Sequence, residues 1–229
     1  MRFADEPATA RAGTQADRKA VPAVAEAVFA AAVADLQAGR DAIGDVRGDI
    51  TFEDCPAPRR LAPFAVAMAA TAHRDGTEVG SGRLVLLYDP DGQDGWTGVF
   101  RLVAQVHADV EPEMAADPLL GEVGWSWLTD ALDSHAPGYS APSGTVTRVI
   151  TEGFGAKEDE PALTGFELRA SWCPEQDDLG GSVAAWCDMI VSAAGLPAQP
   201  PGTRALPARR SRPSRPAKPS RSPGGRRRR

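Results

Sequence analysis

The fold of this chain is decided by residues 75–88, which read DGTEVGSGRLVLLY. Asp75-Gly76 separates two runs of apolar residues, and an Asp-Gly pair in that position is the strongest short-range indication of a β-hairpin. The second run ends in Leu84 to Tyr88, which are apolar at every position, as is typical of a central strand buried on both faces. We therefore predict antiparallel strands over 65–72 and 78–88, although the alanines of the first strand on their own favour helix.

Similar patterns on both sides of this hairpin predict the remaining elements. Gly39 is the expected end of the first helix, Pro112 and Pro118 bracket a short helical turn, and residues 50–53 are a candidate short strand. Apolar residues at helical spacing, and alternating or β-branched runs, define the other elements. We expect helices over 20–38, 119–135 and 179–194, and strands over 96–107, 145–151 and 163–172.

In chain order the elements are a helix, three strands, a helix, two strands and a helix. Each helix is apolar on one side only and needs a sheet to cover that side. We therefore predict an α+β two-layer sandwich, with about five mainly antiparallel strands and three helices mainly on one face. The single domain is expected over 19–197, between a disordered arm (1–18) and a disordered basic tail rich in Arg, Pro and Ser (198–229).

The charge of the chain is divided between its two parts. The net charge is −6, but residues 201–229 hold 11 of the 25 Lys and Arg residues and none of the 31 acids. Residues 1–200 therefore hold 14 basic and 31 acidic residues, a net charge of −17. So acidic a body is not expected to bind nucleic acid in general. No apolar run approaches the roughly 20 residues of a membrane span, so we expect no membrane association. The N-terminus lacks a secretory pattern, and three distant cysteines give no disulfide framework. We therefore expect a cytoplasmic protein.

The sequence contains no motif that specifies a catalytic, metal or cofactor site. The three histidines form no i, i+4 pair, the three cysteines include no C-x-x-C, and Gly80-Ser81-Gly82 lacks the third glycine of a phosphate-binding loop. Carboxylates gather at 111–122 and 158–160, where paired acids would serve acid–base chemistry and solvated charged loops are the plainer interpretation. We therefore expect no catalytic residue, no metal and no cofactor, with an enzyme using loop carboxylates as an alternative.

Trp125 is the candidate protein-binding residue. It lies at the edge of the apolar stripe of the helix expected over 119–135, so part of its ring is expected to face solvent. Tryptophan is enriched in the energetically dominant positions of protein interfaces. Core packing is the alternative, as for Trp127, Trp172 and Trp186, which fall on apolar faces.

The tail offers candidate phosphate contacts, because clustered arginines bind nucleic acid through its backbone. It could equally fold back on the acidic body, or be an extension without a function. The tail residues assigned to phosphate contact are Arg209, Arg210, Arg212, Arg215, Arg226, Arg227, Arg228 and Arg229.

Residues 117–132, DPLLGEVGWSWLTDAL, closely resemble an uncharacterised actinobacterial family, the domain of unknown function numbered 3000. The resemblance covers roughly 20–197, and the Trp-Ser-Trp block carries most of its specificity. It implies a cytoplasmic context and no catalytic residues. It also implies a link to RNA metabolism, because members are often encoded near a ribonuclease D-like exonuclease. Supporting matches lie at 82–90, 144–148, 167–172 and 193–197.

A second resemblance concerns the order of elements, which is similar to that of small acidic secretion-chaperone folds that dimerise and bind protein segments. Fold analogy alone does not establish function. The leading hypothesis is a non-enzymatic binding or adaptor protein that recognises a protein partner and self-associates. The alternative is an RNA-metabolism accessory factor that contacts nucleic acid only through its tail.

Overall fold

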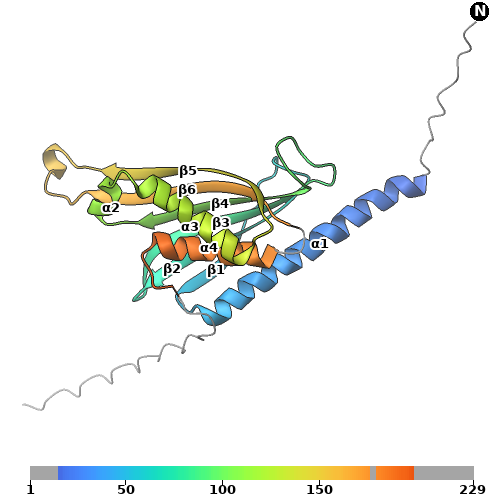
Figure 1. The fold of residues 1–229 in the computed structure, drawn as a ribbon, viewed down its shortest axis with the longest axis horizontal. Helices are drawn as coiled ribbons and strands as arrows, with labels where there is room; N and C mark the ends of the chain where they lie inside the picture. The colour runs from blue at the N-terminus through green and yellow to red at the C-terminus, as the bar shows by residue number, and fades with distance from the viewer. Residues whose placement is uncertain (1–14, 176–178, 199–229) are drawn as a thin grey trace, which may run out of the picture.

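The computed structural model describes residues 15–175 and 179–198. Its centre is a six-stranded sheet with the order β1-β2-β3-β4-β6-β5, in which all neighbours are antiparallel (Figure 1). The strands are β1 (Ile50–Cys55), β2 (Phe64–Arg74), β3 (Thr77–Tyr88), β4 (Phe100–Asp109), β5 (Ser140–Thr151) and β6 (Leu163–Cys173). The helices are α1 (Gln15–Val46), α2 (Pro112–Ala116), α3 (Leu120–His135) and α4 (Leu179–Ala193), with a 3-10 turn η1 (Gly155–Lys157).

The β2–β3 hairpin confirms the prediction drawn from the Asp-Gly pair. Arg74 pairs with Thr77, so Asp75 and Gly76 form a two-residue loop. Both have a positive φ, 53° and 82°, which is what a type I′ turn requires of its two central residues. Strand β3 lies in the interior of the sheet, between β2 and β4, as its apolar second half predicts.

Helices α3 and α4 cover one face of the sheet, and the main core lies between the two layers (Figure 1). Trp172 of β6 and Trp186 of α4 are fully buried there. Each indole N–H is satisfied, Trp172 Nε1 donating to Ser182 Oγ at 3.3 Å and Trp186 Nε1 to the Gln105 carbonyl at 3.4 Å. The predicted two-layer α+β class, with the helices mainly on one face, is confirmed.

The structure adds one strand and one helix to the predicted set. Residues 50–55 pair along their length with β2, so the candidate short strand is the sixth strand of the sheet. The turn between Pro112 and Pro118 is a short α-helix, α2, which makes four helices rather than three. Strand β4 begins at Phe100 rather than at Trp96, because residues 96–99 belong to the loop that precedes it.

Helix α1 is longer than predicted at both ends, spanning Gln15–Val46 rather than 20–38. Its first turn occupies residues 15–18, which belong to the arm that the sequence predicts to be disordered. Gly39 was expected to end the helix, and this expectation is wrong. A Cβ atom at Gly39 would lie 2.6 Å from the Cα of Gly180, so this glycine allows α1 and α4 to cross closely. Helix packing, not capping, explains its presence.

The opposite face of the sheet carries no helix in the described part of the chain. A small apolar cluster formed by Ala67, Val85 and Leu87 lies on it near one end, with Trp96 and Ala62 packed against it from loops. The rest of this face, called the open face below, carries mainly polar side chains. None of the helices in the described ranges is sufficiently long and apolar to cross a membrane.

Candidate binding face

The open face carries two rows of polar side chains, set by the register of three neighbouring strands. Arg83 pairs with Gln105, and Gln105 with Arg169, so these three side chains lie side by side across β3, β4 and β6. The next row, two residues further along each strand, places Ser81 beside His107 and Glu167. Side chains two residues apart on a strand point to the same face, so both rows belong to one surface.

A hollow of about 370 Å³ lies over these two rows. Its volume is at the lower end of the range found for small-ligand sites. Short side chains on β2 and β3, such as Ala69, Thr71 and Ser81, leave space between the longer ones. The remaining lining residues include Arg83, Gln105, His107, Glu167 and Arg169.

The cationic groups of the hollow are only weakly neutralised by neighbouring acids. The side chain of Arg169 is 68% exposed, and its Nη2 lies 3.9 Å from Glu167 Oε2. The imidazole of His107 lies beside two carboxylates, 4.0 Å from Glu167 Oε1 and 3.9 Å from Asp109 Oδ1. Arg83 donates from Nη2 to the Pro56 carbonyl, while its buried Nε has no hydrogen-bond partner among the described residues. A buried donor without an acceptor is costly, so the hydrogen-bonding capacity of the Arg83 guanidinium is only partly used.

A second polar cluster lies near one end of the open face, around Arg101. Its guanidinium donates to Ser171 Oγ at 2.8 Å, Ser143 Oγ at 3.1 Å and Cys173 Sγ at 3.2 Å. Burial by itself raises the pKa of the Cys173 thiol, but hydrogen bonds from the Thr97 amide and Arg101 outweigh it, and the pKa is lowered. Cys173 is only 2% exposed, so this thiolate-favouring environment does not open to a substrate. The cluster joins β4, β5 and β6.

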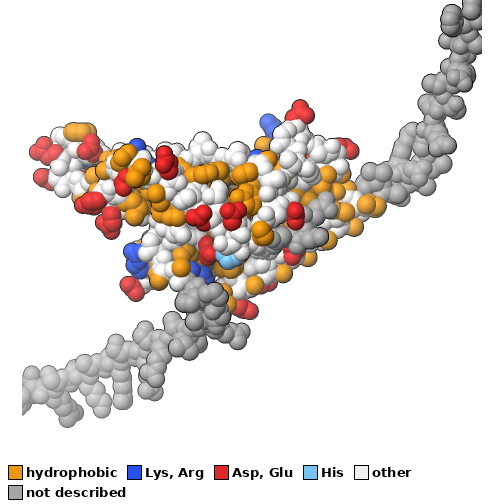
Figure 2. All heavy atoms as spheres, viewed as in Figure 1, with side chains coloured by type: hydrophobic (Ala, Val, Ile, Leu, Met, Phe, Trp, Pro, Cys, Tyr) orange, Lys and Arg blue, Asp and Glu red, His pale blue; other side chains and the backbone are white. Residues whose placement is uncertain are grey.

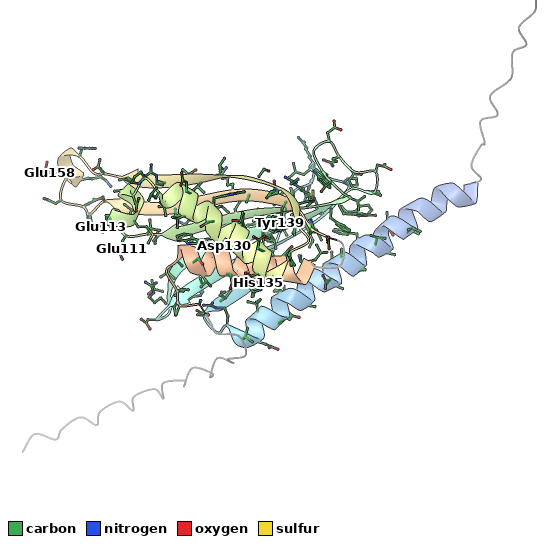
Figure 3. The ribbon with its side chains drawn as sticks, in the orientation of Figure 1. Glu111, Glu113, Asp130, His135, Tyr139 and Glu158 are labelled. Atoms are coloured by element: carbon green, nitrogen blue, oxygen red, sulfur yellow. The ribbon has the colours of Figure 1, made fainter. Side chains whose placement is uncertain are left out.

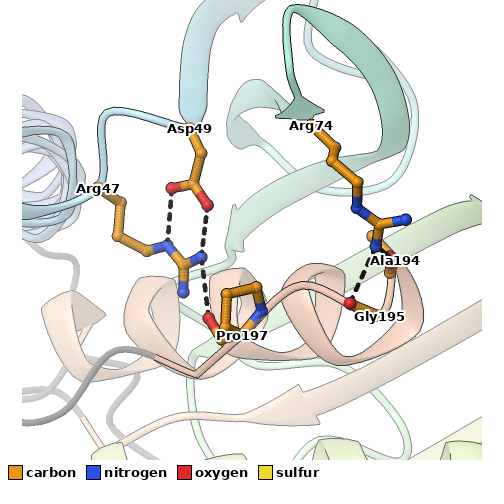
Figure 4. Close-up of polar contacts among 6 residues, drawn as sticks. All are labelled: Arg47, Asp49, Arg74, Ala194, Gly195 and Pro197. Carbon is orange, nitrogen blue, oxygen red and sulfur yellow. Dashed lines mark hydrogen bonds and ion pairs between the residues drawn. The ribbon is translucent and has the colours of Figure 1, made fainter. Parts of the chain in front are cut away.

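Two arginines bind the end of α4 to the rest of the domain (Figure 4). Arg47, 4% exposed, forms a two-pronged ion pair with Asp49, at 3.0 and 2.7 Å, and lies 3.5 Å from the Pro197 carbonyl. The Arg47 hydrogen bond holds the pKa of the Asp49 carboxyl below its usual value. Arg74 Nη2 donates to the carbonyls of Ala194 and Gly195, at 2.8 and 2.9 Å. Cations at a helix C-terminus are also favoured by the helix dipole.

The loop carboxylates do not converge into one site. In Figure 3, Glu158 lies at the tip of the β5–β6 hairpin, Glu111 and Glu113 lie at α2, and His135 lies at the far end of α3. No group of three or more His, Cys, Asp or Glu side chains suited to a metal occurs among the described residues. His135 Nε2 is instead 2.7 Å from Asp188 Oδ2 of α4, a hydrogen bond that joins two helices.

Tyr139 follows α3 and lies close to its acidic side (Figure 3). Burial raises the pKa of its hydroxyl, and a hydrogen bond with Asp133 and the negative charge of Asp130 add to that effect. The raised pKa keeps the phenol protonated and able to donate a hydrogen bond.

Trp125 is half-buried and packs on the side of the sheet that the helices cover. A Cβ atom at Gly144 of β5 would lie 2.8 Å from Trp125 Cζ3, so the indole lies directly over that glycine. Trp127 is also half-buried, with its ring 5.8 Å from that of Phe166. The interface role of Trp125 remains a prediction, and it belongs to the helix side rather than to the open face.

The tail arginines assigned to phosphate contact, from Arg209 to Arg229, lie outside the described residues. The structure shows only where the chain leaves the body, at Pro197 beside Arg47. The surface visible in Figure 2 carries acidic side chains over the helices and the hairpin tip, with few basic ones. The acidic character of the body is therefore visible on its helix side.

Sequence reasoning missed Arg83, Gln105, His107 and Arg169 as a group. The alternation of the 163–172 strand correctly places Arg169 on its polar face. What the alternation does not reveal is that β6 inserts between β4 and β5, which brings Arg169 beside Gln105. A glutamine and arginines at matching positions of polar strand faces are the only sequence indication of the hollow.

Residues 25–203 match the model of the family DUF3000, which is described as a protein of unknown function. The match spans most of the chain, and the chain belongs to this family. Its limits enclose all six strands and end before Arg204, so the Arg-rich tail lies beyond the family domain. No curated protein and no solved structure matches the chain.

Proposed function

We propose that this protein is a non-enzymatic binding or adaptor protein whose body recognises a protein partner through the open face of its sheet. The observation that supports this most is the asymmetry of the sheet. Helices and the main core cover one face, while the centre of the other holds a hollow between Arg83, Gln105 and Arg169. The three cysteines of the chain are free, which suits a reducing compartment such as the cytoplasm.

The chemistry of the hollow favours a protein segment that carries a carboxylate. Arg83 and Arg169 stand on either side of Gln105, two strand spacings or about 10 Å apart. Arginine binds carboxylates through paired N–H groups, and a glutamine amide both donates and accepts, as a peptide backbone requires. One or two acidic side chains in an extended segment would satisfy this pattern.

Nucleic acid fits the hollow less well. Single strands are bound by stacking bases on aromatic rings, and no Phe, Tyr or Trp lines the hollow. A body with a net charge of −17 also repels a polyanion at long range. Any contact with RNA would therefore depend on the tail rather than on the open face.

Site-specific photocrosslinking tests this proposal. A photoreactive residue at Gln105 reports on the open face, and the same residue at exposed Glu122 of α3 is the matched control on the helix side. We expect a discrete protein adduct from position 105 that is absent from position 122. The adduct should disappear when Arg83 and Arg169 are both changed to Gln. Equal adducts from both positions, or an adduct that survives the double substitution, would contradict the proposal.

Removal of the tail separates the two candidate functions. A chain that ends at residue 203 retains the whole family domain and loses every arginine assigned to phosphate contact. The binding proposal expects the adduct at position 105 to persist in this shortened chain. An RNA-metabolism accessory factor would instead lose RNA binding, and with it the steep dependence of that binding on salt.

A further inference from the structure

The sheet has two edges of very different character. Strand β5 lies at one end of the strand order and β1 at the other, and no described strand pairs with the outer side of either (Figure 1). An unpaired strand edge presents backbone N–H and C=O groups that can pair with another chain. Native proteins usually protect such an edge with a short strand, charged side chains, prolines or a bulge. Strand β1 is protected in this way. It has only six residues, and it carries Glu53 and Asp54, the latter bound by Arg40 of α1 at 2.8 Å.

Strand β5 is protected against pairing with another chain only at its beginning. Pro142, the positive φ of Ala141 and a register shift between Ser140 and Ser143 interrupt pairing there. From 143 to 151 the strand runs on for nine residues with neither a proline nor an acid. Six of these nine residues are β-branched, the composition that strengthens strand pairing. They are Thr145, Val146, Thr147, Val149, Ile150 and Thr151.

The observations favour a second copy of this chain as the occupant of this edge. Two bodies that each carry a net charge of −17 repel one another unless they meet where acids are absent, and residues 143–151 meet that condition, with Arg148 as the single charged residue. Antiparallel pairing of a strand with itself is also self-complementary, as a two-fold dimer requires.

The protein's own tail is a poor occupant of the edge. It leaves the body at Pro197, beside Arg47, which precedes the β1 edge at the opposite side of the sheet. Residues 201–229 contain six prolines and Thr203 as the single β-branched residue. Proline lacks the N–H that strand pairing needs, so this sequence does not favour an added strand.

We propose that two copies of the chain join through antiparallel β5 strands, with the two-fold axis at Thr147, into one continuous twelve-stranded sheet. Thr147 is the midpoint of the uninterrupted segment 143–151. This register places Arg148 opposite Val146 of the second copy rather than opposite another Arg148, which avoids a like-charge pair.

The same register also covers an exposed apolar residue. Ile150, 52% exposed, would stand opposite Gly144 of the second copy, where the half-buried Trp125 lies over the glycine. Residues 144 and 150 lie on the same side of β5, the side that the helices cover. The dimer thus gives the exposed edge of Trp125 an apolar partner. It leaves both open faces accessible, so it does not depend on the binding proposal above.

Light scattering on the full-length protein over a concentration series tests the dimer, with Thr147→Lys as the disrupting variant. Two lysines would meet at the two-fold axis, and we expect the dimer dissociation constant to rise at least tenfold. Thr51→Lys is the matched control, because Thr51 is an exposed threonine on the opposite edge strand. It should leave the constant unchanged. A protein that is monomeric up to about 1 mM, the weak limit of specific association, would overturn the proposal. So would a dimer that Thr147→Lys leaves intact.

Cysteine substitution tests the register independently of stability. Thr147→Cys should form an intermolecular disulfide under mild oxidation, because residues that face each other across a two-fold axis have Cβ atoms about 5 Å apart. Thr51→Cys should give none. A dimer confirmed by light scattering in which position 147 does not crosslink would overturn the register, and with it the β5 interface as proposed.

Discussion

The two faces of the sheet come from the same strands but differ in how their side chains are packed and paired. On the covered face, small and large side chains interlock with α3 and α4, and the polar groups that remain, such as the indole N–H of Trp172, are paired. On the open face, Arg83, Gln105, His107 and Arg169 surround a hollow and make few close contacts with one another. One face is therefore organised for stability. The other retains unused hydrogen-bonding capacity, as a recognition surface needs.

The comparison predicts that substitutions on the covered side change stability and those on the open face change binding. The largest effect is expected at the Arg47–Asp49 ion pair. Asp49→Asn leaves the buried guanidinium without its carboxylate, and we expect a loss of about 3 kcal/mol in the free energy of unfolding. Urea denaturation at pH 7 measures it. A loss below about 1 kcal/mol would show that the pair is no more than a surface salt bridge.

The pH dependence of the same variant checks the cause. The folded pKa of Asp49 is lowered, so its contribution is fully present above the unfolded carboxyl value of about 3.9 and is lost as the pH falls through the folded value. The stability difference between wild type and Asp49→Asn should stay constant from pH 7 to about 5 and shrink below about 4. A difference that persists unchanged at pH 3 would contradict the assignment to charge.

The next largest change in stability is expected at Gly124 of α3, with Gly121 of the same helix as its control. A Cβ atom at Gly124 would lie 2.4 Å from the Phe166 ring, whereas one at Gly121 would meet no atom within 4 Å. Gly124→Ala should therefore destabilise the protein by about 2 kcal/mol through overpacking, although alanine favours helix. Gly121→Ala should stabilise it by about 0.5 kcal/mol. Thermal unfolding of both variants measures the contrast, and two effects of the same sign would refute it.

The smallest effect on stability is expected on the open face. Arg169 is largely exposed and its nearest acid is 3.9 Å away, so Arg169→Ala should change the free energy of unfolding by less than about 0.5 kcal/mol. The same substitution should weaken partner binding. A destabilisation above 1 kcal/mol would mean that Arg169 serves the fold rather than recognition.

The sequence was sufficient for the hairpin and for the fold class, because the Asp-Gly turn and the one-sided helices are local patterns. It was not sufficient for the end of α1. Gly39 directly follows the predicted apolar stripe, where a glycine commonly ends a helix. Only the close approach of Gly180, 141 residues later, shows that Gly39 instead lets α1 and α4 cross closely. The sequence makes β1 no more than a candidate strand, because a short run that contains Glu53 and Asp54 owes its structure to pairing with β2.

The candidate site was harder to foresee than the fold. Arg83 and Arg169 are unremarkable polar positions in separate strands, and they become neighbours of Gln105 only through the order β3-β4-β6. The sequence places Trp125 at the edge of an apolar stripe, and in the structure its side chain is half-buried. Its packing over Gly144 depends on how α3 crosses β5, which no local pattern encodes.

The affinity of the partner captured at position 105, measured as a dissociation constant with purified protein, tests the central claim most directly. We expect Arg83→Gln combined with Arg169→Gln to weaken it at least tenfold, a loss of about 1.4 kcal/mol or more. Asp130→Asn, on the exposed helix side, should leave it unchanged. Weaker binding with Asp130→Asn and unchanged binding with the two arginine substitutions would place recognition on the helix layer and contradict the account.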